Sequence, residues 1–310
     1  MNKEITENIY QKLHLIRVFE EKIIQLYPSD AVKSPVHLSI GQEFIAVATL
    51  PQLKSSDIVF SNYRGHAHYI AKGGDLKKMA AELFGKKTGC AQGKGGSMHL
   101  VDKSAGFMTT SAIVSSSIPN AVGYAQSIKL NNLDDIVVCF FGDGALNEGV
   151  YYESLLYAKL FELPIIFICE NNGLAIHSKL NARLPYRDLT SVPRSMGIDT
   201  DRVCDGSVFS LYDAFAKNLK SCRSSKGPIF LEVICDRYLS HVGPEDDWNL
   251  GYRNKNSIKF DDQLTVLEKK LEKSKVKEIN LNNIAIVETS FEFALNSEFP
   301  SNEDLNKHVF

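Results

Sequence analysis

Residues 136–144 read Ile-Val-Val-Cys-Phe-Phe-Gly-Asp-Gly, an apolar run that leads directly into an acidic turn between two glycines. A continuous apolar run of this kind is typical of a strand that is buried on both faces. Two further runs share this character, at 164–169 and 228–235, and a helical pattern covers 148–161. Strand, helix and strand in this order form a βαβ unit, whose two strands are parallel. We therefore predict an α/β fold with a doubly wound, mainly parallel sheet flanked by helices.

Further helices are predicted where apolar residues recur at helical spacing, and they cover about 4–27, 77–84, 264–271 and 284–299. The first of them ends at Pro28, and the residues from there to about Ser61 are expected to be mostly loop. The last two form a C-terminal helical tail, from about 261 to 310. The sequence shows neither a repeat nor a second core pattern, so we expect a single domain over residues 1–310.

Residues 85–96 contain five glycines and three lysines, a composition that excludes regular structure throughout. We expect a loop there, and long glycine-rich loops are mainly kept for function. From its residues alone, this loop reads as a lysine-bearing cradle for a phosphate. It does not match the P-loop pattern, and residues 142–147 do not match the dinucleotide-binding pattern at its third glycine.

The composition is that of an ordinary globular protein, with 44% hydrophobic and 23% charged residues among 310. A formal net charge of −2 gives no field that would attract nucleic acid or an anionic membrane, so neither is expected as a partner. Six cysteines are scattered without a CxxC pair, and we interpret them as small buried residues in a reducing compartment. The N-terminus has no apolar signal core, and no stretch approaches the ~18 apolar residues of a membrane span. We therefore expect a cytoplasmic protein.

Asp143 comes after one predicted strand and Asn172 after the next. Parallel strands joined by right-handed crossovers end at the same edge of the sheet, which is where open α/β folds bind ligands. A carboxylate and an amide oxygen are hard ligands that suit Mg²⁺, together with phosphate oxygens and water. Taken singly, Asp143 could equally cap a helix, and the Asn-Asn pair could form a turn. Their combination behind two buried strands favours a metal site.

The text GDG at 142–144, followed by NN at 171–172, resembles the thiamine-diphosphate fingerprint. The wider text, GDGALNEG and LPIIFICENN, is similar to the alpha subunit of the decarboxylase component of 2-oxo acid dehydrogenases, of the pyruvate, branched-chain and acetoin types. The likeness runs from the N-terminal helix to residues 300–305. It implies the thiamine-diphosphate-binding fold and three ligands for a Mg²⁺ ion on the cofactor's diphosphate, namely Asp143, Asn172 and the backbone carbonyl of Leu174.

Two other stretches agree with this family. Residues 37–43, HLSIGQE, are similar to a family segment that helps to wall the active site. Residues 62–66, NYRGH, resemble an element in which Tyr63 and Arg64 hold the diphosphate, a role that suits a phenol and an arginine fork. His66, at the end of this element, is then expected to be an active-site imidazole.

The resemblance also places His241, after the third apolar strand, near the diphosphate and the reacting carbon. His241 and His66 are therefore the expected catalytic histidines. Residues 112–119 read AIVSSSIP where the family is glycine-rich, but Ala112 and Val114 would still offer backbone groups to the aminopyrimidine unless positive φ is needed. The residues implied to contact the cofactor are Tyr63, Arg64, Ala112, Val114, Asp143, Gly144, Ala145, Asn172 and His241.

The loop after His241 departs from the family, because it reads VGPEDD at 242–247 in place of a serine-rich text. The serines on which family kinases act are missing from it, so that form of regulation is not expected. The loop helps to select the substrate, which leaves the choice of 2-oxo acid open. His177 stands where the family often has a small hydroxyl residue and could touch the substrate.

The resemblance implies decarboxylation of a small 2-oxo acid, with transfer of the acyl group to a lipoyl-bearing acyltransferase. In this family a separate beta subunit provides the glutamate that acts on the aminopyrimidine, so we expect an α₂β₂ assembly with active sites between subunits. The altered loop after His241 motivates an alternative, a carboligase that uses an aldehyde or a sugar as acceptor. A non-enzymatic nucleotide-binding interaction protein is the third alternative, because a fold does not determine a function.

Overall fold

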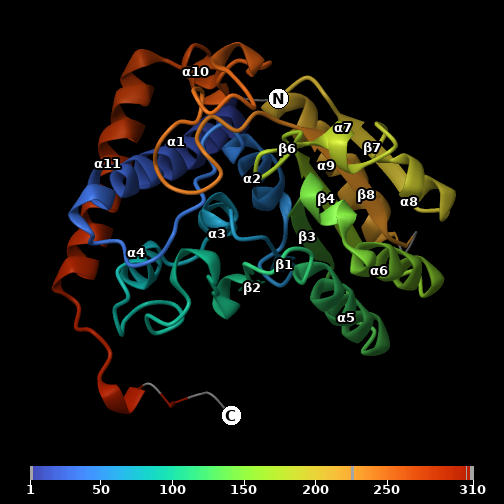
Figure 1. The fold of residues 1–310 in the computed structure, drawn as a ribbon, viewed down its shortest axis with the longest axis horizontal. Helices are drawn as coiled ribbons and strands as arrows, with labels where there is room; N and C mark the ends of the chain where they lie inside the picture. The colour runs from blue at the N-terminus through green and yellow to red at the C-terminus, as the bar shows by residue number, and fades with distance from the viewer. Residues whose placement is uncertain (1–2, 225–226, 305, 308–310) are drawn as a thin grey trace.

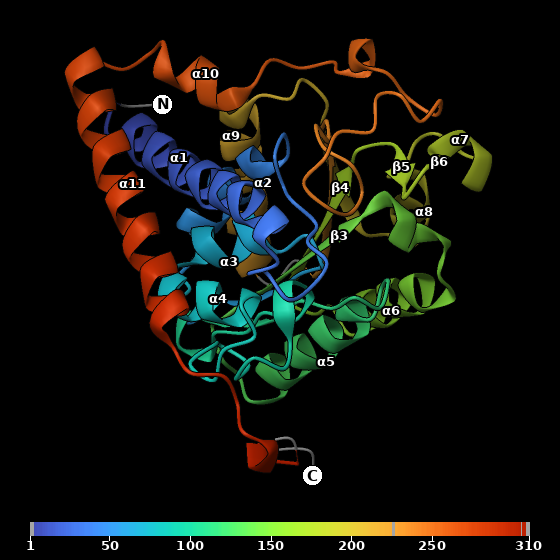
Figure 2. The ribbon, with the colours of Figure 1, turned by 60° about the vertical axis from the view of Figure 1, so that its left-hand side comes forward.

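The computed structural model describes residues 3–224, 227–304 and 306–307. Leu305 and residues 308–310, at the end of the predicted tail, lie outside the described residues. The described elements are arranged in layers, with helices on both faces of a six-stranded sheet (Figure 1 and Figure 2). None of the described helices combines the length and the apolar character needed to cross a membrane.

The central sheet is parallel throughout and has the strand order β2-β1-β3-β4-β8-β7. Its strands are β1 (Ile58–Phe60), β2 (Phe107–Thr109), β3 (Val137–Gly142), β4 (Ile165–Asn171), β7 (Asp199–Val203) and β8 (Ile229–Ile234). A separate antiparallel pair is formed by β5 (Leu174–Ala175) and β6 (Ser178–Lys179). The three apolar runs of the sequence are β3, β4 and β8, which are neighbours in the sheet. The predicted α/β fold with a parallel sheet is therefore confirmed.

Eleven α-helices are assigned within the described residues. They are α1 (Lys3–Leu26), α2 (Glu43–Thr49), α3 (His66–Lys72), α4 (Leu76–Leu83), α5 (Ser117–Leu130), α6 (Gly149–Leu160), α7 (Leu180–Arg183), α8 (Ser191–Ser195), α9 (Val208–Arg223), α10 (Gln263–Glu268) and α11 (Lys273–Asn296). The helices expected at about 4–27, 77–84 and 148–161 are confirmed as α1, α4 and α6.

The central strands of the sheet are buried on both faces, because their side chains alternate between two hydrophobic clusters. In β3, Val138 and Phe140 belong to one cluster, whereas Val137 and Cys139 belong to the other. The first cluster also contains residues of α1, α2, α9 and α11, and the second contains residues of α5 and α6. Figure 2 shows these two helical groups on opposite sides of β3 and β4. This arrangement explains why the sequence shows unbroken apolar runs in place of strict alternation.

Two predicted boundaries are wrong. The last helix, α11, begins at Lys273, well before the expected residue 284, because Val276 and Ile279 bury a face that is otherwise polar. The stretch expected to be loop up to Ser61 contains α2 and β1. Every residue of α2 is buried, so the helix carries no amphipathic pattern, and β1 has only three residues. A single domain over the whole chain stays our interpretation.

The glycine-rich loop at 85–96 is irregular, as predicted, but an internal carboxylate fills it. Glu82 in α4 is fully buried. Its two oxygens accept hydrogen bonds of 2.7 to 3.0 Å from the backbone N–H groups of Ala91, Gly93, Gly95 and Gly96. A Cβ at Gly89 would collide with this carboxylate, so the close approach requires glycine there. The loop is therefore built around Glu82, and its interpretation as a phosphate cradle is corrected.

We expect Glu82→Gln to lower the free energy of unfolding by about 3 kcal/mol, since hydrogen bonds to charged groups contribute ~1.5–3 kcal/mol each. In the variant, an amide NH₂ group would replace one of the two accepting oxygens, and its N–H donors would then face the backbone N–H donors of the loop. Urea denaturation followed by circular dichroism measures the change. Glu21→Gln, at an exposed position of α1, is the matched control. Equal stability of the two variants would contradict the role of Glu82.

Candidate active site

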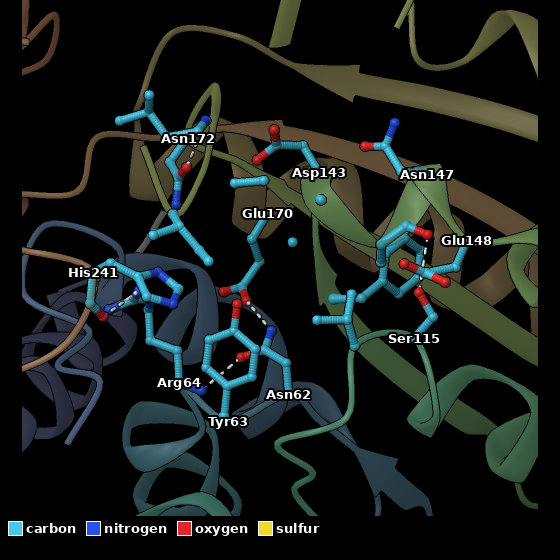
Figure 3. A pocket seen from close by; sticks show the side chains of 18 of the residues that line it. Asn62, Tyr63, Arg64, Ser115, Asp143, Asn147, Glu148, Glu170, Asn172 and His241 are labelled. Carbon is cyan, nitrogen blue, oxygen red and sulfur yellow. Dashed lines mark hydrogen bonds between the residues drawn. The ribbon is translucent and has the colours of Figure 1, made fainter. Parts of the chain in front are cut away.

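Four neighbouring strands end at one edge of the sheet, and the loops that follow them surround a cavity of about 290 Å³. Tyr63 and Arg64 follow β1, Asp143 follows β3, Asn172 follows β4, and His241 lies in the loop after β8 (Figure 3). This is the carboxyl edge, where ligands of open α/β sheets bind. The predicted placement of Asp143 and Asn172 behind adjacent parallel strands is therefore confirmed.

Most of the residues predicted to contact the cofactor or the metal line this cavity, and they are Tyr63, Arg64, Val114, Asp143, Gly144, Ala145, Asn172, Leu174 and His241. Ala112 lies outside the lining, and His177 is exposed and also lies outside it. His66 is wholly buried, with one ring nitrogen 3.2 Å from Glu20 Oε1 and the other 2.8 Å from Ser97 Oγ. Both nitrogens of His66 are thus engaged inside the protein. His66 lies outside the lining of the cavity, and its role as an active-site imidazole stays a prediction.

Asp143 begins the short 3₁₀ turn Asp143–Asn147 after β3 and is almost completely buried. Its Oδ2 forms an ion pair with Arg183, whereas its buried Oδ1 has no hydrogen-bond partner in the part of the chain that the structure describes. Burial raises the pKa of Asp143 above that of an ordinary carboxyl group, although Arg183 acts in the opposite direction. A buried carboxylate oxygen without a partner is costly, and a hard divalent cation would satisfy it. The surroundings of Asp143 therefore fit Mg²⁺.

Asn172 is oriented by hydrogen bonds at both ends of its amide. Its Nδ2 donates to Gln42 Oε1 at 2.8 Å, and its Oδ1 accepts from the backbone N–H of Leu174 at 3.0 Å. Gln42 is buried and belongs to the HLSIGQE segment. An amide oxygen has two acceptor positions, so one position of Asn172 Oδ1 remains for a metal ion.

Arg64 is a buried cation that forms no salt bridge among the residues described. Its guanidinium donates to the backbone carbonyl oxygens of Leu38 at 2.6 Å and His241 at 3.2 Å. Burial, reinforced by Arg237, lowers the pKa of Arg64 to about 10, which still leaves it charged at neutral pH. Burying a charge without a counter-ion costs several kcal/mol, so this wall of the cavity fits an anion such as a diphosphate.

Three rings pack together beside Arg64. The ring centroids of His37 and Tyr63 lie 4.6 Å apart, those of His37 and His241 5.0 Å apart, and those of Tyr63 and His241 5.6 Å apart. Burial and the charge of Arg64 lower the pKa of both His37 and His241 to about 3. Without an anion beside them, both imidazoles are therefore neutral at pH 7. Each can then hold one proton and accept another.

The burial of His37 predicts a stability that decreases in acid. Its pKa is about 3 in the folded chain and 6.5 in the unfolded chain, so as pH falls below 6.5 only the unfolded chain takes up the proton. The free energy of unfolding should therefore fall from pH 6.5 towards pH 3, with no contribution from His37 above pH 6.5. We expect His37→Gln to flatten this dependence in urea denaturations at several pH values. His99→Gln, at an exposed histidine, should leave the slope as in the parent protein.

Glu170 lies outside the predicted set but lines the cavity from β4 (Figure 3). It is buried, its Oε2 accepts a hydrogen bond of 3.1 Å from Asn62 Nδ2, and its Oε1 lies 3.2 Å from a ring nitrogen of His68. The Oδ1 of Asn62 also accepts a hydrogen bond of 2.8 Å from the backbone N–H of Arg64. Glu170 thus fixes the segment that carries Arg64. The sequence signal that could have identified Glu170 is its place as a charged residue at the end of an apolar strand.

The altered segment 112–119 retains a connection to the turn after β3. Ala112 has negative φ, so the change from glycine causes no strain there, whereas Ser115 has a φ of +67°. The Ser115 hydroxyl donates to the backbone carbonyl of Ala145 at 2.9 Å. This hydrogen bond holds Ser115 against the loop that begins with Asp143.

The loop after His241 is held by a buried carboxylate. Asp247 forms a salt bridge of 3.0 Å with Arg237, a second salt bridge with Arg253, and accepts a hydrogen bond from the Tyr252 hydroxyl. Arg253 also donates to the backbone carbonyl oxygens of Arg237 and Leu239, which precede His241. The conformation of this loop therefore depends on Asp247, which stands within the VGPEDD text.

Comparison with known proteins supports one family. A family model described as dehydrogenase E1 component matches residues 11–292. The chain is 30% identical over 307 residues to the alpha subunit of an acetoin:2,6-dichlorophenolindophenol oxidoreductase from Bacillus subtilis (strain 168), a match that covers 97% of this chain and 92% of that protein. It is 33% identical over 310 residues to the alpha subunit of the pyruvate dehydrogenase E1 component from Rickettsia bellii (strain RML369-C), with 97% and 94% covered. The corresponding protein of Rhizobium meliloti (strain 1021) is 35% identical over 257 residues, with 83% and 73% covered.

The match to the family model spans most of the chain, from α1 to α11. It agrees with the resemblance that the motifs around Asp143 and Asn172 indicate. The strand ends, the buried cation and the partnerless carboxylate oxygen lie inside the matched region. The chain therefore belongs to the dehydrogenase E1 component family.

Proposed function

We propose that this chain is the alpha subunit of a thiamine-diphosphate- and Mg²⁺-dependent enzyme that decarboxylates a small 2-oxo acid and transfers the acyl group to a lipoyl partner. One observation carries the proposal. The cavity is walled by Arg64, a buried cation that forms no salt bridge with the described residues, and by Asp143, whose buried Oδ1 has no hydrogen-bond partner among them. A diphosphate with an attached magnesium ion satisfies both groups at once.

The residues of this chain would bind the two parts of that group. Arg64 and Tyr63 would donate hydrogen bonds to diphosphate oxygens. Asp143, Asn172 and the carbonyl of Leu174 would hold the metal. When bound, thiamine diphosphate supplies the carbanion-stabilising chemistry that decarboxylation requires.

His241 is a titratable group that lies next to Arg64 and lines the cavity. Its backbone carbonyl accepts a hydrogen bond from the Arg64 guanidinium, and its ring packs on Tyr63. Burial and the charge of Arg64 lower the pKa of His241, and a bound diphosphate would offset that charge and make the imidazole a better proton acceptor. We propose that His241 holds or moves a proton beside the diphosphate.

The cavity is open on a side where large apolar residues are exposed. Ile113 and Val114 line it and are 71% and 44% exposed. Exposed apolar residues at the rim of a site are typical of a surface that a partner covers. We propose that a beta subunit covers them in an α₂β₂ assembly, which would also exclude water from the reaction.

The test is an assay of 2-oxo acid decarboxylation with a lipoyl domain as acceptor, using the chain alone and with its beta subunit. We expect turnover only when both subunits, thiamine diphosphate and Mg²⁺ are present. Robust turnover by the chain alone would contradict the shared site. Calorimetry that detects no binding of thiamine diphosphate to the assembled subunits would overturn the proposal.

A carboligase is the second candidate function, and the altered loop after His241 favours it. The same preparation can be supplied with an aldehyde acceptor in place of the lipoyl domain. Formation of a condensed hydroxyketone, without acylation of the lipoyl domain, would establish this alternative over acyl transfer.

A further inference from the structure

We propose that Arg183 is a positioning residue for the metal. It holds one oxygen of Asp143 so that the other is presented to the cation, and it joins the two chain segments that carry the metal ligands. The inference rests on the proposed function, because that function places Mg²⁺ at Asp143 and Asn172.

Two of the three nitrogens of the Arg183 guanidinium bind the turn after β3, and Nε donates to the Ser178 carbonyl oxygen of β6 at 3.2 Å. Its Nη2 forms the ion pair with Asp143 Oδ2, and its Nη1 donates to the Asp143 carbonyl at 3.3 Å and to Asn147 Oδ1 at 2.7 Å. Asn147 Nδ2 donates back to the Arg183 carbonyl at 3.1 Å. The Arg183 side chain is only 11% exposed. These contacts define one orientation of the Asp143 carboxylate.

The orientation leaves a specific acceptor available. With Oδ2 engaged by Arg183, the buried Oδ1 of Asp143 is the oxygen that lacks a partner among the described residues. Residues that hydrogen-bond a metal-ligating carboxylate fix its direction before the metal binds, which lowers the entropic cost of binding. Arg183 and a metal ion can therefore use different oxygens of the same carboxylate.

Arg183 also connects segments that are far apart in the sequence. It ends α7, which follows the β5–β6 hairpin that carries Leu174. The backbone N–H of Leu180 donates to the Gly173 carbonyl at 2.9 Å, which closes this hairpin. A Cβ on Gly144 would lie 3.0 Å from Ala175 Cβ, so the hairpin packs closely on the turn after β3. The contacts of Arg183 thus hold the β5–β6 hairpin, which carries Leu174, against the turn that begins with Asp143.

A competing interpretation treats Arg183 as a substitute cation that the metal must displace. It predicts the opposite effect of removing the side chain, since the metal would then bind more tightly. The unpaired Oδ1 of Asp143 favours the positioning role, because it offers the metal a buried oxygen that Arg183 does not occupy. Displacement of Arg183 from Oδ2 would not explain why Oδ1 is buried without a partner.

The test measures the affinity for Mn²⁺, used in place of Mg²⁺, by electron paramagnetic resonance on the assembled subunits with thiamine diphosphate. We expect Arg183→Gln to weaken Mn²⁺ binding by about 10- to 100-fold, the usual effect of losing an outer-shell partner. Arg183→Lys should recover only part of the loss, since an ammonium keeps the charge but cannot hold Asp143 and Asn147 together. Arg187→Gln, at an exposed arginine four residues further along the chain, is the matched control and should bind as the parent does.

The outcomes separate the inference from the proposed function. If the parent protein fails to bind Mn²⁺ with thiamine diphosphate, the proposed metal site is overturned. If the parent binds but Arg183→Gln binds equally or more tightly, the role of Arg183 is overturned. Thermal unfolding without metal shows whether Arg183→Gln folds. Should it not fold, Asn147→Ala removes a single anchor of Arg183, and weaker Mn²⁺ binding by this variant supports the inference whereas unchanged binding overturns it.

Discussion

Asp143→Ala is expected to abolish the Mg²⁺-dependent binding of thiamine diphosphate, with a loss well above the about 100-fold that follows removal of an outer-shell partner. The carboxylate is the one negatively charged group among the proposed metal ligands, and its Oδ1 is already buried without a partner among the residues described. Isothermal titration calorimetry of the assembled subunits, in Mg²⁺ and in EDTA, measures the difference. We expect the parent protein to show a large difference and the variant to show none.

The controls for Asp143→Ala separate binding from folding. Asp143→Asn keeps the size of the side chain and removes the charge, so it should lose binding to a similar extent with less disturbance of Arg183. Asp134→Ala removes an exposed carboxylate just before the opposite end of β3 and should bind normally. Retention of tight Mg²⁺-dependent binding by both Asp143 variants would mean that the metal is held elsewhere.

Arg64→Gln is expected to weaken thiamine diphosphate binding by roughly 100- to 1000-fold, or about 3–4 kcal/mol, since it removes one partner of a buried charge pair. Its effect on the free protein should be small. In the absence of an anion, Arg64 is a buried charge whose described hydrogen bonds go to carbonyl oxygens, and its removal also removes the cost of burying it. Binding and stability should therefore respond very differently to the same substitution.

Calorimetry and thermal unfolding, each with and without the cofactor, test this separation. Arg64→Lys should bind with intermediate affinity, because lysine keeps the charge and loses the fork. Arg194→Gln, at a side chain that is 61% exposed, is the control for removing an arginine. Parent-like affinity of Arg64→Gln would exclude Arg64 as the diphosphate ligand. Strong destabilisation of the free protein would assign Arg64 a structural role instead.

The regular part of the fold was predictable because local chemistry encodes it. The strands at 137–142, 165–171 and 229–234 are mainly apolar runs, and only a sheet that is covered on both faces buries such runs completely. Elements whose residues show no hydrophobic periodicity were missed, because periodicity is the local signal on which the prediction depends. The helix α2 is buried on every side, and α11 begins in a polar stretch whose few apolar residues become informative only against α1.

The candidate site divides in a similar way. Asp143 and Asn172 were predictable because parallel strands deliver whatever follows them to one edge of the sheet. The position of His66 was not predictable, because its ring contacts Glu20, which belongs to the distant helix α1. Glu82 likewise fills the glycine-rich loop, an outcome that composition alone could not distinguish from a phosphate cradle.

By itself, the sequence determined that the chain forms a parallel α/β sheet with an acidic and an amide side chain at its carboxyl edge. Periodicity and strand order are enough for that, since both act over a few residues or between neighbouring strands. Only the tertiary structure decided which buried charges have partners. Among the described residues, Arg64 has no salt-bridge partner and Asp143 Oδ1 has no hydrogen-bond partner. In contrast, Glu82 is fully satisfied, and Arg183 reaches Asp143 from a distant segment. Such pairings depend on side chains that meet across long stretches of sequence, which no local pattern records.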